Sequence, residues 1–387
     1  MKTVKQFSIA TRQCIRSSVL VLIFMNWQAS AQQIQGLTVN QRANTFLVNI
    51  GYDLFYSITN SDVFISIEAS GNNGVTWDLP IMSVSGDIGI VSPGLGKKIV
   101  WDAYLDWPEK RTTEAKVRLR MLTNFMVFIP SGSFKRPTGY NDGSLQTVNL
   151  SAFSIDRFEV TKGLWDKVRN WGLTNGYSDL PQGSAQGSAY PIDQVSWYSA
   201  VKWCNARSEM EQTPPAYYLE STFSTVYRSG ELHPKVLWTT GYRLPTEAEW
   251  EMAAYGGVGP VKYPWAGVTN ITPNLANYAE SALGYAVPVG MYPPNPFGLY
   301  DVLGNLQEIC WDWMADGSRN PSDGLLPQTN PKGPISDNNN GNQPEWKRAR
   351  GGSYSSTDHL MTRGGKRIFE SWGPPTGFRC VLPPRAF

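Results

Sequence analysis

The sequence has little histidine, cysteine or charge. Of its 387 residues two are His, four are Cys, and 17% are charged. No His/Cys cluster has the spacing of a zinc site, and no C-x-x-C or G-x-S-x-G occurs. Counting does not exclude a Ser-His-Asp hydrolase, but neither His233 nor His359 lies in a recognisable catalytic context. The formal charge of +2 gives no general electrostatic case for nucleic acid as a partner.

Turn-forming and aromatic residues are abundant instead. The chain contains 36 Gly, 27 Pro and 15 Trp, and 41% of its residues are hydrophobic. This composition supports real cores, excludes wholesale disorder, and favours many turns and irregular loops over a helical bundle. The length corresponds to two domains, or at most three.

Residues 1–31 have the pattern of a secretory signal peptide. Four basic residues and no acidic one precede an apolar run at 19–25, and Ala29-Ser30-Ala31 matches a cleavage site. The alternative is a membrane anchor, but the run is far below the roughly 18 residues needed to span a bilayer. We therefore expect an exported protein, periplasmic or secreted, with no membrane span after cleavage. Cleavage would leave 30 basic and 32 acidic residues.

Residues 32–122 are predicted to form an all-β domain. Short β-branched and aromatic runs at 46–50, 63–67 and 97–101 are separated by turn signals, and residues 116–122 alternate strictly. Several short strands in one such segment indicate a β-sandwich of immunoglobulin or fibronectin-III type. The segment has no Cys and nothing that looks catalytic, so a spacer or adhesion role is expected.

Residues 125–387 have a mixed pattern. Residues 125–134 are typical of the start of a hairpin. One helix is predicted from Ser196 through Cys204, with apolar residues at helical spacing. A second follows Thr246, where Glu249 completes a capping box. Loops are expected to dominate elsewhere, including a long surface excursion at 314–347.

Several segments of this second region carry a family resemblance. In chain order they are FEVT (158–161), PIDQVSW (191–197), YRLPTEAEWE (242–251), NPFGLYDVLGNLQE (295–308), RGGSY (350–354) and GFRC (377–380). In this order and spacing they resemble the formylglycine-generating enzyme family, also called sulfatase-modifying factors. The resemblance covers about two thirds of the chain, and it implies an α+β fold related to C-type lectins.

The resemblance implies a calcium site in the loop after FGLY. The matching positions are Asp301, Gly304, Leu306 and Glu308, where the two acids would supply carboxylates and the other two residues backbone carbonyls. Hard oxygen ligands on a bent loop suit Ca²⁺. The alternative is a turn with two solvated acids. A second calcium site of the family begins near Asn277, but its further ligands have no obvious match here.

The copper site of the family is not matched. Active members hold copper(I) with two thiolates and oxidise a substrate cysteine with O₂, and soft sulfur ligands suit Cu(I). Ser356 and Met361 occupy those two positions here, so copper is not expected, although Ser353 is retained. Gln307 stands where the family has a Trp in its substrate groove.

The resemblance also implies one disulfide. Three Cys remain after residue 31, which allows at most one internal pair in an oxidising compartment and leaves one thiol over. The family joins the Cys of its first helix to that of GFRC, which here are Cys204 and Cys380. This pairing leaves Cys310 unpaired.

Three functions remain open at this point. The first is a non-catalytic or diverged family member that binds a protein, peptide or glycan through its lectin-like face. The second is an active protein-cysteine oxidase that makes formylglycine on sulfatases. The third is an iron-dependent oxidase like the related sulfoxide synthases, which place their His ligands in a helical domain that this chain lacks.

Overall fold

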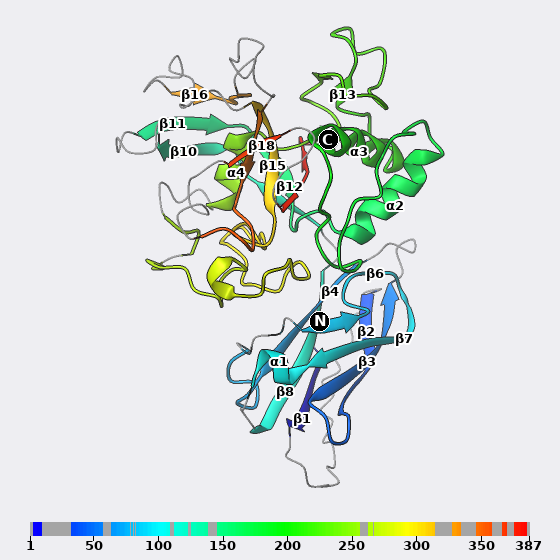
Figure 1. Cartoon of the computed structure of the whole chain (residues 1–387), viewed down its shortest axis with the longest axis vertical. Helices are drawn as coiled ribbons and strands as arrows, with labels where there is room; N and C mark the ends of the chain where they lie inside the picture. The colour runs from blue at the N-terminus through cyan, green and yellow to red at the C-terminus, as the bar shows by residue number, and fades with distance from the viewer. Residues whose placement is uncertain are drawn as a thin grey trace. The chain divides into compact units, whose positions relative to one another are not determined.

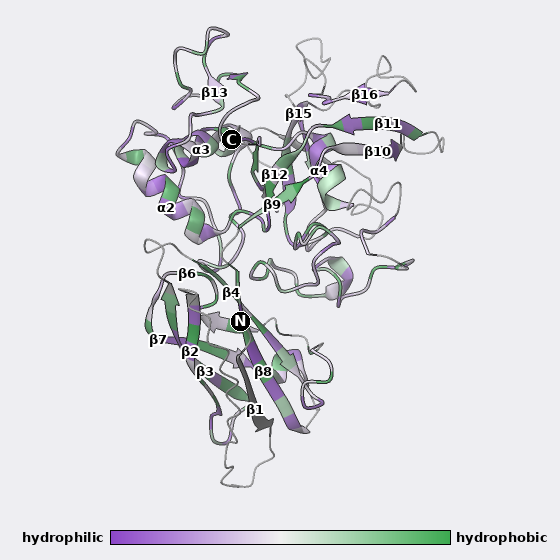
Figure 2. Cartoon of the chain, turned by 180° about the vertical axis from the view of Figure 1, so that it is seen from behind, coloured by the Kyte–Doolittle hydropathy of each residue, from purple (hydrophilic) through white to green (hydrophobic). Residues whose placement is uncertain are grey.

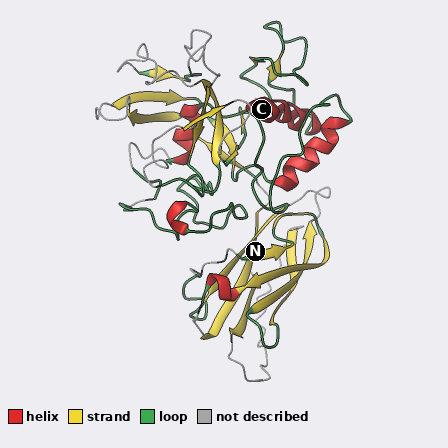
Figure 3. Ribbon diagram, viewed as in Figure 1, coloured by secondary structure: helices red, strands yellow, loops and turns green. Residues whose placement is uncertain are grey.

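The computed structural model divides into two compact units, Met1–Phe125 and Met126–Phe387 (Figure 1). The residues that the structure describes are 3–9, 32–56, 63–77, 79, 81, 83–108, 112–122, 125–137, 145–255, 262–265, 267–313, 327–333, 346–357, 366–369 and 375–384. Sheets and loops predominate over helices, so the chain has a mixed α+β fold with few helices (Figure 3).

The first unit is built from two four-stranded antiparallel sheets. One has the order β1 (Thr3–Ile9), β8 (Thr112–Leu122), β4 (Val63–Ser70) and β6 (Gly89–Val91). The other has the order β2 (Gln32–Gln41), β3 (Leu47–Tyr56), β7 (Gly94–Asp102) and β5 (Val84–Gly86). The short helix α1 (Ala103–Asp106) follows β7.

Alternation along the strands builds the core of this unit. Val117 and Leu119 on β8 are fully buried, as the sequence pattern predicts, while Met121 is only partly buried. Hydrophilic and hydrophobic residues alternate visibly along β8 (Figure 2). In the same unit, the Trp101 indole donates to Asp106 Oδ2 at 2.8 Å, and this hydrogen bond ties β7 to α1.

Strand β1 falls inside the segment predicted to be a signal peptide. It pairs antiparallel with β8, from Thr3 opposite Leu119 to Ile9 opposite Thr112. Residues 10–31, which include the apolar run and the cleavage motif, lie outside the described residues. The signal peptide therefore stays a prediction.

Three helices of the second unit begin at side-chain caps. They are α2 (Lys162–Leu173), α3 (Trp197–Met210) and α4 (Glu247–Ala254), capped by Thr161, Ser196 and Thr246. The capping box predicted at the start of α4 is confirmed, because Thr246 Oγ1 accepts from Glu249 N and the Glu249 carboxylate accepts from Thr246 N. Helix α2 was not predicted from the sequence.

Short strands complete the second unit in four small sheets. Their orders are β20 (Val381–Leu382), β12 (Phe153–Asp156) and β9 (Met126–Ile129); β10 (Gly132–Pro137), β11 (Leu145–Leu150) and β16 (Gln328–Thr329); β18 (Lys366–Phe369), β17 (Trp346–Arg350), β15 (Gln307–Trp313) and β19 (Thr376–Gly377); and β13 (Tyr217–Tyr218) with β14 (Lys235–Val236). Between α4 and β15 the chain is mostly loop, with one 3₁₀ turn at Ala279–Ser281 (Figure 3).

The hairpin predicted at residues 125–134 is wrong. Strand β9 pairs with β12, whereas β10 pairs with β11 in a different sheet. Pro130 lies between β9 and β10, and a proline has no N–H to offer a ladder. The chain therefore changes sheets at this point, and the real hairpin is β10–β11.

Buried tryptophans hold the second unit together. Trp165 on α2 and Trp203 on α3 stack with ring centroids 5.6 Å apart and planes within 3°. Phe378 packs edge-on against both rings. Such aromatic pairs add about 0.5–1.5 kcal/mol beyond their area burial. This packing fixes the segment of Phe378 and Arg379 beside the helices, and Arg379 is the centre of the candidate site.

Candidate functional site

A buried arginine organises the polar interior of the second unit. Arg379 is 1% exposed, and its guanidinium forms a bidentate ion pair with Glu308, with Nε–Oε2 and Nη2–Oε1 distances of 2.6 Å. The Trp250 indole donates to the same Oε2 at 2.7 Å. Arg379 also donates to the carbonyls of Asp156 and Tyr300. One side chain thus ties the C-terminal segment to three distant parts of the chain.

The loop from Asp301 to Glu308 is bent by left-handed residues. Asp301, Gly304 and Asn305 have φ of 54°, 81° and 59°. A Cβ on Gly304 would lie 2.1 Å from the carbonyl oxygen of Asn277, so only glycine fits there. Asn305 N donates to that same carbonyl, and Gly304 N donates to Gly351 O. These contacts clamp the loop between two other segments.

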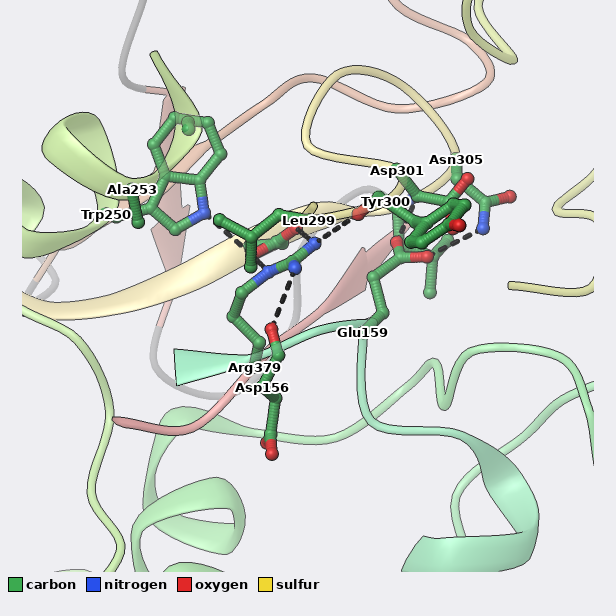
Figure 4. Close-up of polar contacts among 12 residues, drawn as sticks. Asp156, Glu159, Trp250, Ala253, Leu299, Tyr300, Asp301, Asn305 and Arg379 are labelled. Carbon is green, nitrogen blue, oxygen red and sulfur yellow. Dashed lines mark hydrogen bonds and ion pairs between the residues drawn. The ribbon is translucent and has the colours of Figure 1, made fainter. Parts of the chain in front are cut away.

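A further buried carboxylate, Glu159, supports this loop. It accepts from Leu306 N at 2.9 Å and from Asn305 Nδ2 at 2.7 Å (Figure 4). Burial raises the pKa of Glu159 well above its usual range, and the charges of Asp301 and Glu308 raise it further. Glu159 belongs to the FEVT segment, but sequence reasoning gave it no role. Its partners lie almost 150 positions away, so nothing local signals it.

The three carboxylates share a single guanidinium. Burial raises the pKa of Asp301 to about 7, while the hydrogen bond from Gly290 N and the charge of Arg379 oppose that rise. With all three acids ionised, Glu159, Asp301 and Glu308 would leave a net charge of −2 around Arg379. A buried excess of this kind requires protons or a bound cation.

The carboxylates of the two predicted acidic calcium ligands, Asp301 and Glu308, differ in their hydrogen bonding. Asp301 Oδ2 accepts from Gly290 N at 2.6 Å, but Oδ1 is buried without a hydrogen-bond partner. Both oxygens of Glu308 already accept from Arg379. In the described part of the chain, no three His, Cys, Asp or Glu side chains gather in a way that could hold a metal ion. A cation at this loop would therefore depend on backbone carbonyls, as the resemblance implies for Gly304 and Leu306.

Ser353 and Ser356 form a closed turn. Ser353 N donates to Ser356 Oγ at 2.9 Å, Ser356 N donates to Ser353 O, and Ala279 N donates to Ser356 O. Ser356 is fully buried and Ser353 is 1% exposed. Met361 and His359 lie outside the described residues. Of the two positions at which the family has copper thiolates, the described one is thus a buried hydroxyl engaged in a turn.

Gln307 lies on β15 and has a structural role. It is 1% exposed, and its amide Nε2 donates to Thr376 Oγ1 at 2.7 Å, across the β15–β19 pair. Its Oε1 is buried and has no hydrogen-bond partner. The amide therefore faces inward from the strand and does not form an aromatic wall.

Cys204 and Cys380 lie next to each other, as the resemblance implies, but as free thiols. Their Sγ atoms are 3.5 Å apart, far beyond the roughly 2.05 Å of a disulfide bond. The predicted disulfide is therefore not formed in this structure. Cys310 is buried separately, and burial raises its pKa well above the usual range, with Asp312 and Glu247 adding to the rise. A thiol held neutral in this way is inert.

Comparison with known proteins places this geometry in a family. Residues 111–383 match the model of the family described as "Sulfatase-modifying factor enzyme 1-like domain". The chain belongs to the sulfatase-modifying factor family. The match begins one residue before β8 of the first unit and ends just after β20, so it includes every residue of this site.

Relatives within the sulfatase-modifying factor family carry different names. The chaperone protein LppX of Paenibacillus barcinonensis is 29% identical over 283 residues, 66% of this chain and 88% of that protein. A formylglycine-generating enzyme of Thermomonospora curvata is 26% identical over 306 residues, 67% of this chain and 93% of that one. The inactive C-alpha-formylglycine-generating enzyme 2 of Bos taurus is 29% identical over 228 residues, 49% of this chain and 70% of that one.

Solved structures agree with this assignment. Treponema denticola variable protein 1 superposes with a TM-score of 0.52 at 30% identity, covering 67% of this chain and 95% of that one. CarF gives a TM-score of 0.52 at 24% identity, which supports the fold alone.

Among the helices that the structure describes, none is long and apolar enough to cross a membrane.

Proposed function

We propose that this sulfatase-modifying factor family member does not make formylglycine and instead binds a protein, peptide or glycan ligand. The observation that carries the proposal is the buried, hydrogen-bonded hydroxyl of Ser356. A buried hydroxyl that is held by Ser353 N is a hard, neutral group, and it does not supply the soft thiolate that Cu(I) needs. The residues present therefore do not fit a two-thiolate copper site.

In this proposal the ligand binds to the surface beside the turn that Ser353 and Ser356 form. Tyr354 and Asp193 are partly exposed there, and Ser355 and Gln194 are exposed. Asp193 Oδ1 accepts from Thr376 N, and its charge acts on Tyr354, whose pKa is raised mainly by burial and further by that carboxylate. An aromatic ring beside a fixed carboxylate and hydroxyl groups suits a polar ligand with some apolar surface.

The relatives support a binding role from two directions. The bovine relative is named an inactive enzyme, so at least one family member is described as having lost the activity. The Paenibacillus relative is named a chaperone protein, which favours a protein or peptide ligand over a glycan. The alternative, an active cysteine oxidase, has support in the enzyme from Thermomonospora curvata.

The proposal includes calcium at the 301–308 loop. Asp301 Oδ1, with the Gly304 and Leu306 carbonyls, would hold the ion, and Glu308 would contribute charge while paired with Arg379. The unpartnered buried Oδ1 supports a divalent cation, and so do the raised pKa values of Glu159 and Asp301, since a cation would stabilise their ionised forms in place of protons. The role of the ion would be to brace the loop, since hard oxygen ligands suit Ca²⁺ and not redox chemistry.

The remaining parts of the proposal concern the chain's organisation. The segment 32–122 would be an immunoglobulin- or fibronectin-III-like sandwich that carries the family domain at 125–387, whose fold would be C-type-lectin-like. The two antiparallel sheets of the first unit support the sandwich. The protein would be exported, periplasmic or secreted, after removal of residues 1–31, and nucleic acid would not be its partner.

The decisive experiment supplies copper(I), oxygen and a sulfatase-type cysteine peptide to the purified protein. We expect no aldehyde product by mass spectrometry and no stoichiometric copper. The Thermomonospora curvata enzyme under the same conditions is the positive control. The double variant Ser356→Cys, Met361→Cys tests the scaffold: a gain of copper binding by the variant alone supports a diverged oxidase. Enzyme-like conversion by the unmodified protein would show that the proposal is wrong.

A further inference from the structure

A second candidate binding site is a pocket of about 340 Å³ in the second unit. It lies between the β11–β12 connection at 150–153, the segment 238–239, the start of α4, residues 330–332 after β16, and residues 383–384. None of its lining residues belongs to the 301–308 loop or to the Ser353 turn. The volume is at the lower end of the range for small-molecule sites.

Two cationic side chains, Lys332 and Arg243, line this pocket. Lys332 is exposed, and its Nζ lies 4.7 Å from the centroid of the Trp238 ring. Among the described residues it pairs with no carboxylate. Arg243 is 4% exposed, its Cζ lies 4.9 Å from the same centroid, and its Nε is buried without a hydrogen-bond partner. Because Arg243 Nε is a buried atom, the exposed Lys332 Nζ is the donor that a ligand in the pocket can reach.

Two of the side-chain acceptors that line the pocket, Glu249 and Asn330, are already engaged. Glu249 takes two 2.7 Å hydrogen bonds from the two terminal nitrogens of Arg243 and a third from Thr246 N. Asn330 Oδ1 accepts from Ser151 N at 2.8 Å. The ion pair neutralises Arg243, so the charge of Lys332 is left over. The accessible donor and the unbalanced positive charge of Lys332 together favour a ligand that is an anion and an acceptor.

The walls define the rest of the ligand. Apolar side chains form the walls of the pocket: the partly exposed Trp238 ring, Leu150, Phe153, Pro331 and the Pro383–Pro384 pair. A bare inorganic anion would leave this apolar surface uncovered. We propose that the pocket binds a small organic carboxylate with an apolar body.

In this arrangement the carboxylate lies beside Lys332 Nζ, and the apolar body covers Trp238 and the prolines. The carboxylate pairs with the ammonium charge of Lys332, which a neutral amide or ester cannot do. The same chemistry is offered by a free fatty or aromatic acid and by the C-terminal residue of a peptide. The site does not depend on the proposed ligand face near Ser353.

Calorimetric titration of the full chain tests this inference. The probes are hexanoate, N-acetyl-leucine as a peptide C-terminus, hexanamide as the neutral match of hexanoate, and sulfate. We expect at least one of the two carboxylates to bind, with hexanamide and sulfate about tenfold weaker or more, because a hydrogen bond to a charged group is at stake. Whichever carboxylate binds more tightly identifies the source of the natural ligand.

The variant Lys332→Gln should weaken carboxylate binding by about tenfold or more, and it should fold normally because Lys332 is exposed. Lys235→Gln is the matched control, since Lys235 is an exposed lysine on β14 that does not line the pocket. Equal binding of hexanamide and hexanoate, equal binding of sulfate, or a Lys332→Gln variant that binds like the wild type would overturn the proposal. So would a failure of both carboxylates to bind more tightly than about 10 mM.

Discussion

Arg379 and Glu308 form a bidentate ion pair in which each residue is only 1% exposed. The two residues are 71 positions apart in the sequence, and they join the last segment of the chain to the 301–308 loop. Removing one partner of such a pair leaves a buried charge without compensation, whereas removing both does not. Single and double substitutions at Arg379 and Glu308 therefore test how much this ion pair contributes to stability.

Arg379→Met should destabilise the protein by about 3–5 kcal/mol in urea denaturation, because Glu308 would be left buried and unpaired. The double variant Arg379→Met, Glu308→Gln should cost less than the sum of the two single variants. Lys162→Met is the control, since the Lys162–Asp166 pair is partly exposed and is worth about 1 kcal/mol or less. Equal costs at Arg379 and Lys162 would contradict the expectation.

Gly304→Ala should destabilise the protein more than a left-handed glycine normally does. The new Cβ would lie 2.1 Å from Asn277 O, a backbone atom that cannot move aside cheaply. Gly284 has a similar φ of 76° with nothing within 4 Å, so Gly284→Ala isolates the backbone cost of about 1–2 kcal/mol. We expect a clearly larger loss of melting temperature for Gly304→Ala, measured by thermal unfolding. Equal losses in the two variants would remove the steric argument.

Much of the helical structure could be read from local signals. The capping box of Thr246 and Glu249 and the cap at Ser196 are local patterns, and both helices start where these residues place them. Helix α2 was missed because Gly163 and Gly172 lower its propensity. Its stability comes from the packing of Trp165 against α3, which no local window contains.

The site was only partly predictable for the same reason. The loop 301–308 was identified through the family resemblance, and Asp301 does have a free buried oxygen there. The sequence could not show that Glu308 is committed to Arg379 or that Glu159 supports the loop. These contacts join segments 71 and 147 positions apart, and they exist only once the sheets have formed.

Calcium should raise the melting temperature of the wild type, and Asp301→Asn should abolish most of that rise. The expected stabilisation is about 2.7 kcal/mol at a hundredfold excess over Kd. Asn keeps the shape of the side chain but removes the negative charge that a calcium ion requires. Glu280→Gln is the control, because Glu280 is an exposed acid near the site and should leave the response unchanged. A wild-type melt that is insensitive to calcium and to chelator would count against the site.

Stability should fall as pH rises from about 4 to 7, in part because of Asp312. Burial raises its pKa to about 7, and the charge of Glu247 adds to the rise, while the hydrogen bond from Glu247 N and the charges of Arg136 and Arg348 oppose it. A carboxyl with a raised pKa in the folded state binds its proton more tightly there than in the unfolded chain. Its stabilising contribution is therefore complete at low pH and is lost as pH approaches 7.

Asp312→Asn should weaken this pH dependence, because the amide resembles the protonated acid and can still accept from Glu247 N. Relative to the wild type, the variant should gain about 3 kcal/mol of stability between pH 5 and pH 8, because each pH unit below the pKa of about 7 contributes about 1.4 kcal/mol. Urea titrations at the two pH values measure the difference. Glu231→Gln, at an exposed position, provides the comparison. Parallel pH profiles for the wild type and Asp312→Asn would refute the assignment.

Oxidation should join Cys204 to Cys380 and leave Cys310 as a thiol. The Sγ atoms of the first two are already 3.5 Å apart in the core, so a small shift brings them to bonding distance, whereas Cys310 is buried in a different cluster. The bond would close a loop of about 175 residues, for which chain entropy gives about 5 kcal/mol as an upper figure. Non-reducing peptide mapping after expression in an oxidising compartment identifies the pairing. The reduced and oxidised wild type should then differ in urea midpoint, while Cys380→Ser should show no such difference. A mapped bond between Cys310 and either of the other two would show that the pairing is wrong.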